Sequence, residues 1–164
     1  MVSARHRPDP DKSLVGFRVG DVHYAVPIGH VREIVNPLPV VGLPHAPRAV
    51  IGVADHRGEV VPIIDLRQRF GLPPHDDPER AKWILVDVSG RAIGLRVDQV
   101  TEVFGTGGGE LRPAPELGGG DDTRGIVGVT AHEDGMVFVL DVQRFEHLTE
   151  PLAAAGALGD GRSD

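Results

Sequence analysis

The amino-acid sequence predicts an all-β protein with short helices, folded as two SH3-sized, five-stranded β-barrels. Two observations favour this class. Val, Ile and Leu supply most of the apolar side chains, and 22 Gly and 14 Pro divide the 164 residues into short segments, a pattern typical of short strands joined by turns. The chain also repeats itself, and no long helix is available to cover an open sheet. Closure into small barrels would protect the sheet edges.

In the first half, strands are expected where apolar residues alternate or run briefly between turn residues. Gly20-Asp21 joins the first two strands as a tight hairpin, and residues 55–58 form the turn of a second hairpin. Residues 27–30 read as a turn, and four prolines interrupt residues 37–47. The expected strands are residues 14–19, 22–26, 31–36, 50–54 and 59–64.

A short helix is predicted after the second hairpin. Asp65 can accept hydrogen bonds from the free N–H groups of a first turn that begins at Leu66, so it is a suitable N-cap. Gly71 can adopt the left-handed conformation that closes a helix, and the two prolines at 73 and 74 cannot continue one. The helix is therefore expected to end by Phe70.

The second half repeats the pattern of the first. Glycine-rich stretches between the matching blocks account for a change in their spacing, because loops accept insertions at a small entropic cost. Each copy is expected to contain five strands and to end in a capped helix, with Asp141 in the place of Asp65. The matching blocks are residues 24–34 with 93–103, and residues 48–65 with 124–141.

The repeat sets the expected domain organisation. Residues 74–80 have the composition of a linker, so the division between the two copies is placed near Arg80. Both ends lack a strand pattern and are expected to be flexible. The predicted segments are an N-terminus over residues 1–13, a domain over 14–150 with subdomains at about 14–80 and 81–150, and a tail over 151–164.

Charge and composition exclude several classes of function. Lys and Arg number 17 against 24 Asp and Glu, a formal net charge of −7, so the chain cannot rely on phosphate neutralisation and nucleic-acid binding is not expected. Cysteine is absent, which excludes disulfides and thiol nucleophiles. No apolar run approaches the roughly 20 residues of a membrane span, and no secretory signal is visible. No membrane insertion and a cytoplasmic location are expected.

No catalytic constellation is visible, so no enzyme activity, cofactor or metal is expected. His56 and His132 occupy equivalent turns in the two halves, and a metal there would need a carboxylate companion such as Asp55 or Glu133. Both histidines are expected to be ordinary polar residues of exposed turns. A metal-binding or small-ligand-binding β-barrel protein stays open as a distant alternative.

Several short motifs follow one another in a fixed order over most of the chain, and together they resemble the CheW-like adaptor family of bacterial chemosensory systems. The resemblance covers residues 14–148. The motifs are Gly20-Asp21-x-x-Tyr24-Ala25-Val26-Pro27-Ile28, Val31-Arg32-Glu33-Ile34, Ile51-Gly52-Val53-x-x-x-Arg57-Gly58, Gly94-Leu95-x-Val97-Asp98-x-Val100, Arg112-Pro113-Ala114-Pro115-Glu116 and Gly125-Ile126-Val127-Gly128.

The resemblance implies two SH3-like five-stranded β-barrel subdomains and a function. That function is a non-enzymatic adaptor coupling methyl-accepting chemoreceptors to a CheA-type histidine kinase, in a chemotaxis or motility pathway, at receptor arrays on the inner face of the membrane. A groove near the barrel junction would take the receptor's coiled-coil tip, and the first barrel would dock on the kinase regulatory domain. The implied receptor-binding residues are Val31, Glu33 and Arg57, and the implied kinase-binding residues are Ile51, Gly52 and Val53.

One departure from the family pattern lies beside Arg57. The family usually has Asn-Leu before the Arg-Gly of this hairpin, whereas this chain has Asp55-His56. An arginine at an exposed turn is unusual, since such turns favour Asn, Asp or Gly, and it can anchor a partner carboxylate. The departure leaves open a CheW-like paralogue that competes in, or scaffolds, the array without activating the kinase.

Overall fold

A computed structural model describes residues 13–74, 77–105, 111–113, 125–133 and 135–149. The expected flexible ends and glycine-rich stretches lie almost wholly outside these residues, although Ser13 already belongs to the first strand and is buried. The strands are β1 Ser13–Val19, β2 Val22–Pro27, β3 Val31–Val35, β4 Val50–His56, β5 Glu59–Asp65, β6 Lys82–Val88, β7 Arg91–Val97, β8 Gln99–Gly105, β9 Ile126–His132 and β10 Gly135–Leu140; the helices are η2 Ile28–His30, α1 Leu66–Arg69, η3 Pro78–Arg80 and η4 Val142–Phe145.

The all-β class with short helices is confirmed, and so are the strands expected in the first half, to within one or two residues at each end. Two small differences concern turns. The turn after β2 and part of the linker each close into one turn of 3₁₀ helix, η2 and η3. Both aspartate caps are also confirmed, because Asp65 accepts a hydrogen bond from the Arg67 backbone N at 3.1 Å and Asp141 accepts one from Gln143 N at 3.0 Å.

The repeat is confirmed as an order of elements. Five strands and a short helix, β1 to α1, are followed by five strands and a short helix, β6 to η4. The strands form two sheets with the orders β8-β1-β2-β10-β9 and β3-β6-β7-β5-β4. Each strand has a counterpart at the same place in the other half, as β1 has in β6. When every strand of the first sheet is replaced by its counterpart, the strand order of the second sheet results, so the two sheets are related by an internal pseudo-symmetry.

The expectation that each half would supply all the strands of one unit is wrong, because the halves exchange strands. The first sheet takes β1 and β2 from the first half and β8, β9 and β10 from the second, and the other sheet has the complementary set. The reason lies in two short connections. The helix η2 leads from β2 into the other sheet, where β3 pairs with β6, and Asp98 alone separates β7 from β8. Closure of each sheet into a barrel stays a prediction.

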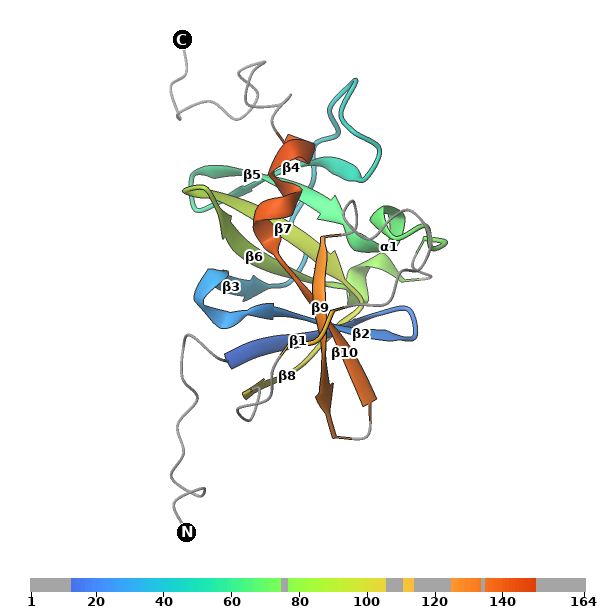
Figure 1. Cartoon of the computed structure of the whole chain (residues 1–164). Helices are drawn as coiled ribbons and strands as arrows, with labels where there is room; N and C mark the ends of the chain where they lie inside the picture. The colour runs from blue at the N-terminus through green and yellow to red at the C-terminus, as the bar shows by residue number, and fades with distance from the viewer. Residues whose placement is uncertain (1–12, 75–76, 106–110, 114–124, 134, 150–164) are drawn as a thin grey trace.

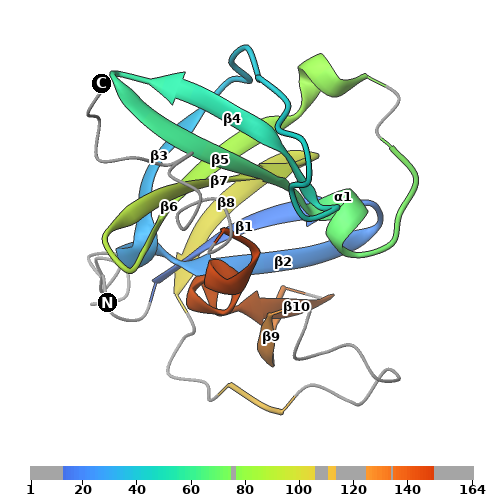
Figure 2. The ribbon, with the colours of Figure 1, turned by 90° about the horizontal axis from the view of Figure 1, so that it is seen from above.

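The exchanged strands form two sheets that lie one above the other (Figures 1 and 2). In Figure 1 strands β4 to β7 lie above β1, β2 and β8 to β10. The largest cluster of buried side chains nevertheless contains members of both sheets, including Phe17, Val26, Ile84, Leu95 and Leu140. Each such side chain contributes about 1.5–3 kcal/mol on burial. Because the largest cluster draws on both sheets, the division at Arg80 does not separate two independent cores.

A buried ion pair reinforces this junction. The Asp98 side chain is only 5% exposed and accepts a hydrogen bond from Arg67 Nη1 at 2.5 Å. Its Oδ2 atom also accepts one from the backbone N of Gly20 at 2.7 Å. Arg67 follows β5 and Gly20 lies in the β1–β2 turn, so Asp98 ties the two sheets together at the point where the chain passes between them.

Candidate functional site

The β4–β5 hairpin projects an arginine from its tip. Arg57 has a φ of 55°, a left-handed conformation that residues other than glycine adopt infrequently. The turn is held by Asp55, whose Oδ1 accepts a hydrogen bond from Gly58 N at 2.8 Å. Asp55 is therefore occupied in shaping the turn, and the Arg57 side chain, 74% exposed, extends into solvent.

Arg57 meets a glutamate from the far edge of the same sheet. Glu33 on β3 accepts a hydrogen bond from Arg57 Nη2 at 3.1 Å, and its other oxygen lies 3.5 Å from His56 Nε2. Strands β3 and β4 are the two edges of their sheet, so the sheet curls until these edges approach at the hairpin end. The structure thus brings together two of the three predicted receptor-binding residues.

Val31, the third, lies two residues before Glu33 on β3. Its side chain is half-buried and packs against the main core. Arg32, between them, bonds to Glu59 at 3.3 Å and to Asp87 at 3.2 Å. Val31 therefore supports the position of β3, while Glu33 and Arg57 present charge at the surface.

The predicted kinase-binding residues lie on β4, beside a segment that already covers this edge. Val41 and Val53 exchange two backbone hydrogen bonds of 2.8 and 2.9 Å. Gly52 has a φ of +148°, and a Cβ placed there would lie 2.3 Å from the Val41 carbonyl oxygen. The backbone of Val53 is thus already paired, so this edge can offer a partner only apolar side chains at that position. Val40 is 36% exposed and Val41 is 65% exposed, and the half-buried Ile51 lies beside them.

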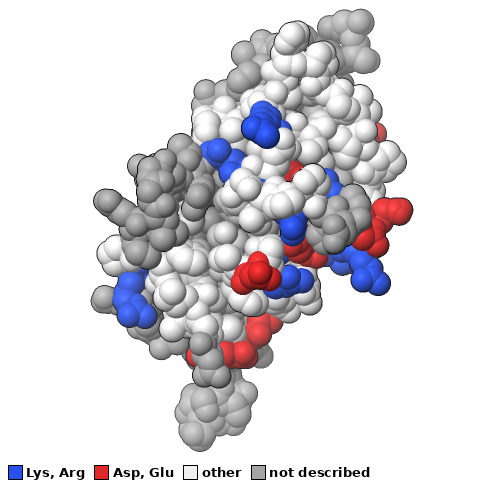
Figure 3. Space-filling view, turned by 90° about the vertical axis from the view of Figure 1, so that its right-hand side faces the viewer, with Lys and Arg blue, Asp and Glu red and all other residues white. Residues whose placement is uncertain are grey.

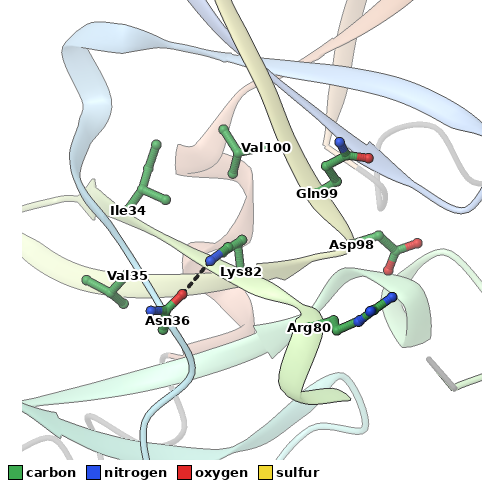
Figure 4. A pocket seen from close by; sticks show the side chains of 8 residues that line it. All are labelled: Ile34, Val35, Asn36, Arg80, Lys82, Asp98, Gln99 and Val100. Carbon is green, nitrogen blue, oxygen red and sulfur yellow. Dashed lines mark hydrogen bonds between the residues drawn. The ribbon is translucent and has the colours of Figure 1, made fainter. Parts of the chain in front are cut away.

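A groove of about 240 Å³ lies at the junction of the sheets (Figure 4). Strand β3 borders it from one sheet and the start of β8 from the other. Ile34, which follows Glu33, is 43% exposed there, and Lys82 donates a hydrogen bond to Asn36 across one wall. The family resemblance implies a groove near the barrel junction without naming its lining. The residues that line the groove seen here are Ile34, Val35, Asn36, Arg80, Lys82, Asp98, Gln99 and Val100.

The second half contains a counterpart of the Glu33–His56–Arg57 cluster. His132 Nε2 lies 3.2 Å from Glu102 Oε2 and 3.9 Å from Glu133 Oε1. Glu133 has the same φ of 55° as Arg57. The equivalence of His56 and His132 is confirmed, and of the two predicted companions only Glu133 lies beside a histidine in this way. Glu33 was expected as a receptor-binding residue and the repeat aligns it with Glu102, but neither glutamate was expected to lie beside a histidine.

Charged side chains on the face drawn in Figure 3 are mixed rather than sorted by sign. Acidic and basic groups lie side by side there, between broad uncharged areas. Among the described residues, moreover, no helix has the length and apolar character to cross a membrane.

Comparisons with known proteins agree with this arrangement. Residues 13–149 match the family described as CheW-like domain. The probable chemotaxis protein CheW of Rhizobium etli is 33% identical over 144 residues, which is 88% of this chain and 93% of that protein. The chemotaxis protein CheW of Rhizobium meliloti is 33% identical over 140 residues, covering 85% of this chain and 90% of that protein. The crystal structure of the scaffolding protein TtCheW from Thermoanaerobacter tengcongensis has a TM-score of 0.75 and 30% sequence identity, covering 88% of this chain and 91% of that one.

Proposed function

The chain belongs to the CheW-like domain family, and from this membership we propose that it is a non-enzymatic adaptor that couples methyl-accepting chemoreceptors to a CheA-type histidine kinase. The match over residues 13–149 is the observation that carries the proposal. The adaptor would work at receptor arrays on the inner face of the membrane, in a chemotaxis or motility pathway.

The receptor side is proposed at the groove and the charged pair beside it. Glu33 and Ile34 are neighbours on β3 with side chains on opposite faces of the sheet, so a partner that straddles this strand would contact both the Glu33–Arg57 pair and the groove. Ile34 and Val100 give the groove an apolar part. A helical hairpin presents an apolar stripe with flanking charges, so the stripe would enter the groove while Glu33 and Arg57 fix its register.

The kinase side is proposed at the covered edge of β4. Val40, Val41, Ile51 and Val53 form an apolar patch on and beside this strand. Because Val53 already shares its backbone hydrogen bonds with Val41, a docking domain would be held by apolar side-chain contact there. Gly52 would contribute indirectly, by letting residues 40–41 lie flat against the strand.

Reconstitution tests the proposed function. Purified receptor signalling fragment, CheA-type kinase and this chain are combined, and kinase autophosphorylation is measured with each component omitted in turn. The adaptor function predicts a severalfold higher rate only when all three are present. An unchanged rate contradicts it. A rate lowered by this chain identifies instead the competing paralogue that the Asp55-His56 departure suggested.

The substitution Arg57→Glu tests the receptor surface. It removes the guanidinium and places a second carboxylate beside Glu33, so receptor recruitment should fall more than about tenfold, or about 1.4 kcal/mol. Affinity for the isolated kinase regulatory domain should stay within about threefold, because the proposed patch on β4 is unaltered. Both affinities can be measured by pull-down and titration.

Arg112→Glu is the matched control. Arg112 is also exposed and lies beside β9, so this substitution changes the net charge equally without touching β3 or the β4–β5 hairpin. Receptor recruitment should be unaffected. Equal losses from the two substitutions, or a parallel loss of receptor and kinase binding in Arg57→Glu, would remove the receptor assignment.

A further inference from the structure

The two pseudo-symmetric clusters differ at one charged residue, which is Arg57 in the first half and Glu133 in the second. In the first half Glu33 and His56 are joined by Arg57, and in the second half Glu102 and His132 are joined by Glu133. With both histidines neutral, the first cluster has a formal charge of zero and the second of −2. The first cluster therefore contains its own cation, whereas the second presents two carboxylates and an imidazole around the equivalent position.

The second cluster has the donor atoms of a metal site. One ligand atom from each of Glu102, His132 and Glu133 can be chosen so that all three lie within 4.8 Å of one another. The three side chains line a pocket of about 270 Å³ between β8 and the β9–β10 hairpin. Imidazole and carboxylate ligands suit zinc and neighbouring divalent transition metals.

The histidine ring is fixed in place and its Nε2 atom is left unused. His132 stacks on Phe104 with ring centroids 3.9 Å apart, and Phe104 is itself buried. The Nε2 atom is buried as well, yet it makes no hydrogen bond among the described residues. The nearest Glu102 oxygen is 3.2 Å away. This nitrogen, with a carboxylate of Glu102 and one of Glu133 nearby, is placed to act as a ligand to a cation.

The spacing suits a tetrahedral ion. Ligand bonds of about 2.1 Å separate neighbouring ligand atoms by about 3.4 Å around such an ion. The separation of 3.2 Å between His132 Nε2 and Glu102 Oε2 already fits. Glu133 Oε1 is 3.9 Å from Nε2 and has to move inward to complete this geometry, which its side chain, 73% exposed, is free to do.

We propose that Glu102, His132 and Glu133 bind a divalent transition-metal ion, with zinc as the representative ion. Three protein ligands leave one position for water or for a donor atom from a partner. This site lies in the other sheet from the proposed receptor pair and is independent of the adaptor function, so the failure of either proposal leaves the other standing.

Calorimetric titration tests the site. The full chain is treated with a chelator, exchanged into chelator-free buffer and titrated with zinc chloride. One zinc ion should bind per chain, and His132→Gln or Glu133→Gln should weaken binding more than about tenfold, since each removes one of three ligands. His56→Gln, the same change at the equivalent position of the first half, is the matched control and should leave zinc affinity unchanged.

A charge-reversing substitution separates loss of zinc binding from loss of folding. Glu133→Arg gives the second cluster the charge pattern of the first, so it should abolish zinc binding without lowering the thermal unfolding temperature. Absence of zinc uptake by the unaltered chain overturns the proposal, and so does equal uptake by His132→Gln. If zinc does not bind but Glu133→Arg weakens capture of the kinase regulatory domain, the carboxylates serve a basic residue of a partner and the metal assignment is wrong.

Discussion

Replacing Asp98 by alanine is expected to lower the free energy of unfolding by about 3 kcal/mol, because removing one member of a buried ion pair leaves the other charge without compensation. Asp98 is 5% exposed, and Arg67, its partner, is 19% exposed. The substitution also deprives the Gly20 N–H of its acceptor. Urea denaturation followed by circular dichroism measures the loss.

Asp87→Ala provides the comparison for this prediction. Asp87 also pairs with an arginine, Arg32, but its side chain is 48% exposed, and solvent-exposed pairs contribute at most about 1 kcal/mol. Asp98→Asn should fall between the two, since its amide oxygen can still accept from Gly20. If Asp98→Ala and Asp87→Ala cost the same, Asp98 does not hold the two sheets together at their junction.

Gly52→Ala should cost about 2–4 kcal/mol, combining backbone strain at a positive φ with overpacking. The added Cβ would lie 2.3 Å from the Val41 carbonyl oxygen and 2.6 Å from Val40 Cγ1. The segment over residues 40–41 would have to move away from β4. Kinase binding should fall together with stability, because the apolar patch depends on that segment.

Gly135→Ala is the control for the glycine effect, since nothing lies within 4 Å of the position its Cβ would take. It should change stability by less than about 0.5 kcal/mol. Val41→Glu separates the two roles of the edge. Val41 is 65% exposed, so this variant should keep its stability and lose kinase binding. A Gly52→Ala variant of undiminished stability would contradict the packing argument.

Local structure was predictable because its causes lie within a few residues. Asp65 and Asp141 cap helices through the N–H groups of their own first turns, and Gly20-Asp21 closes a hairpin between adjacent strands. Alternation of apolar residues gave the strands. These features depend on the backbone nearby and hold whichever sheet a strand joins.

Sheet membership could not be predicted in the same way. In a duplicated chain, β3 and β8 are alike, so an arrangement within each half and an exchanged arrangement place similar side chains in similar surroundings. The choice is made by η2 and by Asp98, which turn the chain toward the other sheet. Neither segment differs in composition from an ordinary turn.

The candidate site was likewise predictable only in part: its residues could be named from the sequence, but their contacts could not. Motif positions pointed to Glu33 and Arg57, and the structure places them in contact. The contacts of His56 with Glu33 and of His132 with Glu102 join residues far apart in the chain. These residues lie on opposite edges of a sheet and meet only because the sheet curls. The spacing of residues in the sequence does not predict that curvature. The repeat pairs Glu33 with Glu102 and His56 with His132, but it does not show that a glutamate of one strand meets a histidine of another.

The exchange of strands determines the order in which the sheets can be completed during synthesis. All five strands of the β3-β6-β7-β5-β4 sheet have been made by Val97. The β1–β2 hairpin is made first, yet it gains its neighbours only with β8 and β10, through pairs such as Leu14 with Phe104. Such distant pairings slow folding. Until β8 and β10 have been made, both edges of the β1–β2 hairpin are unpaired. Unpaired strand edges can pair with other chains, so the nascent chain is prone to aggregation at this stage.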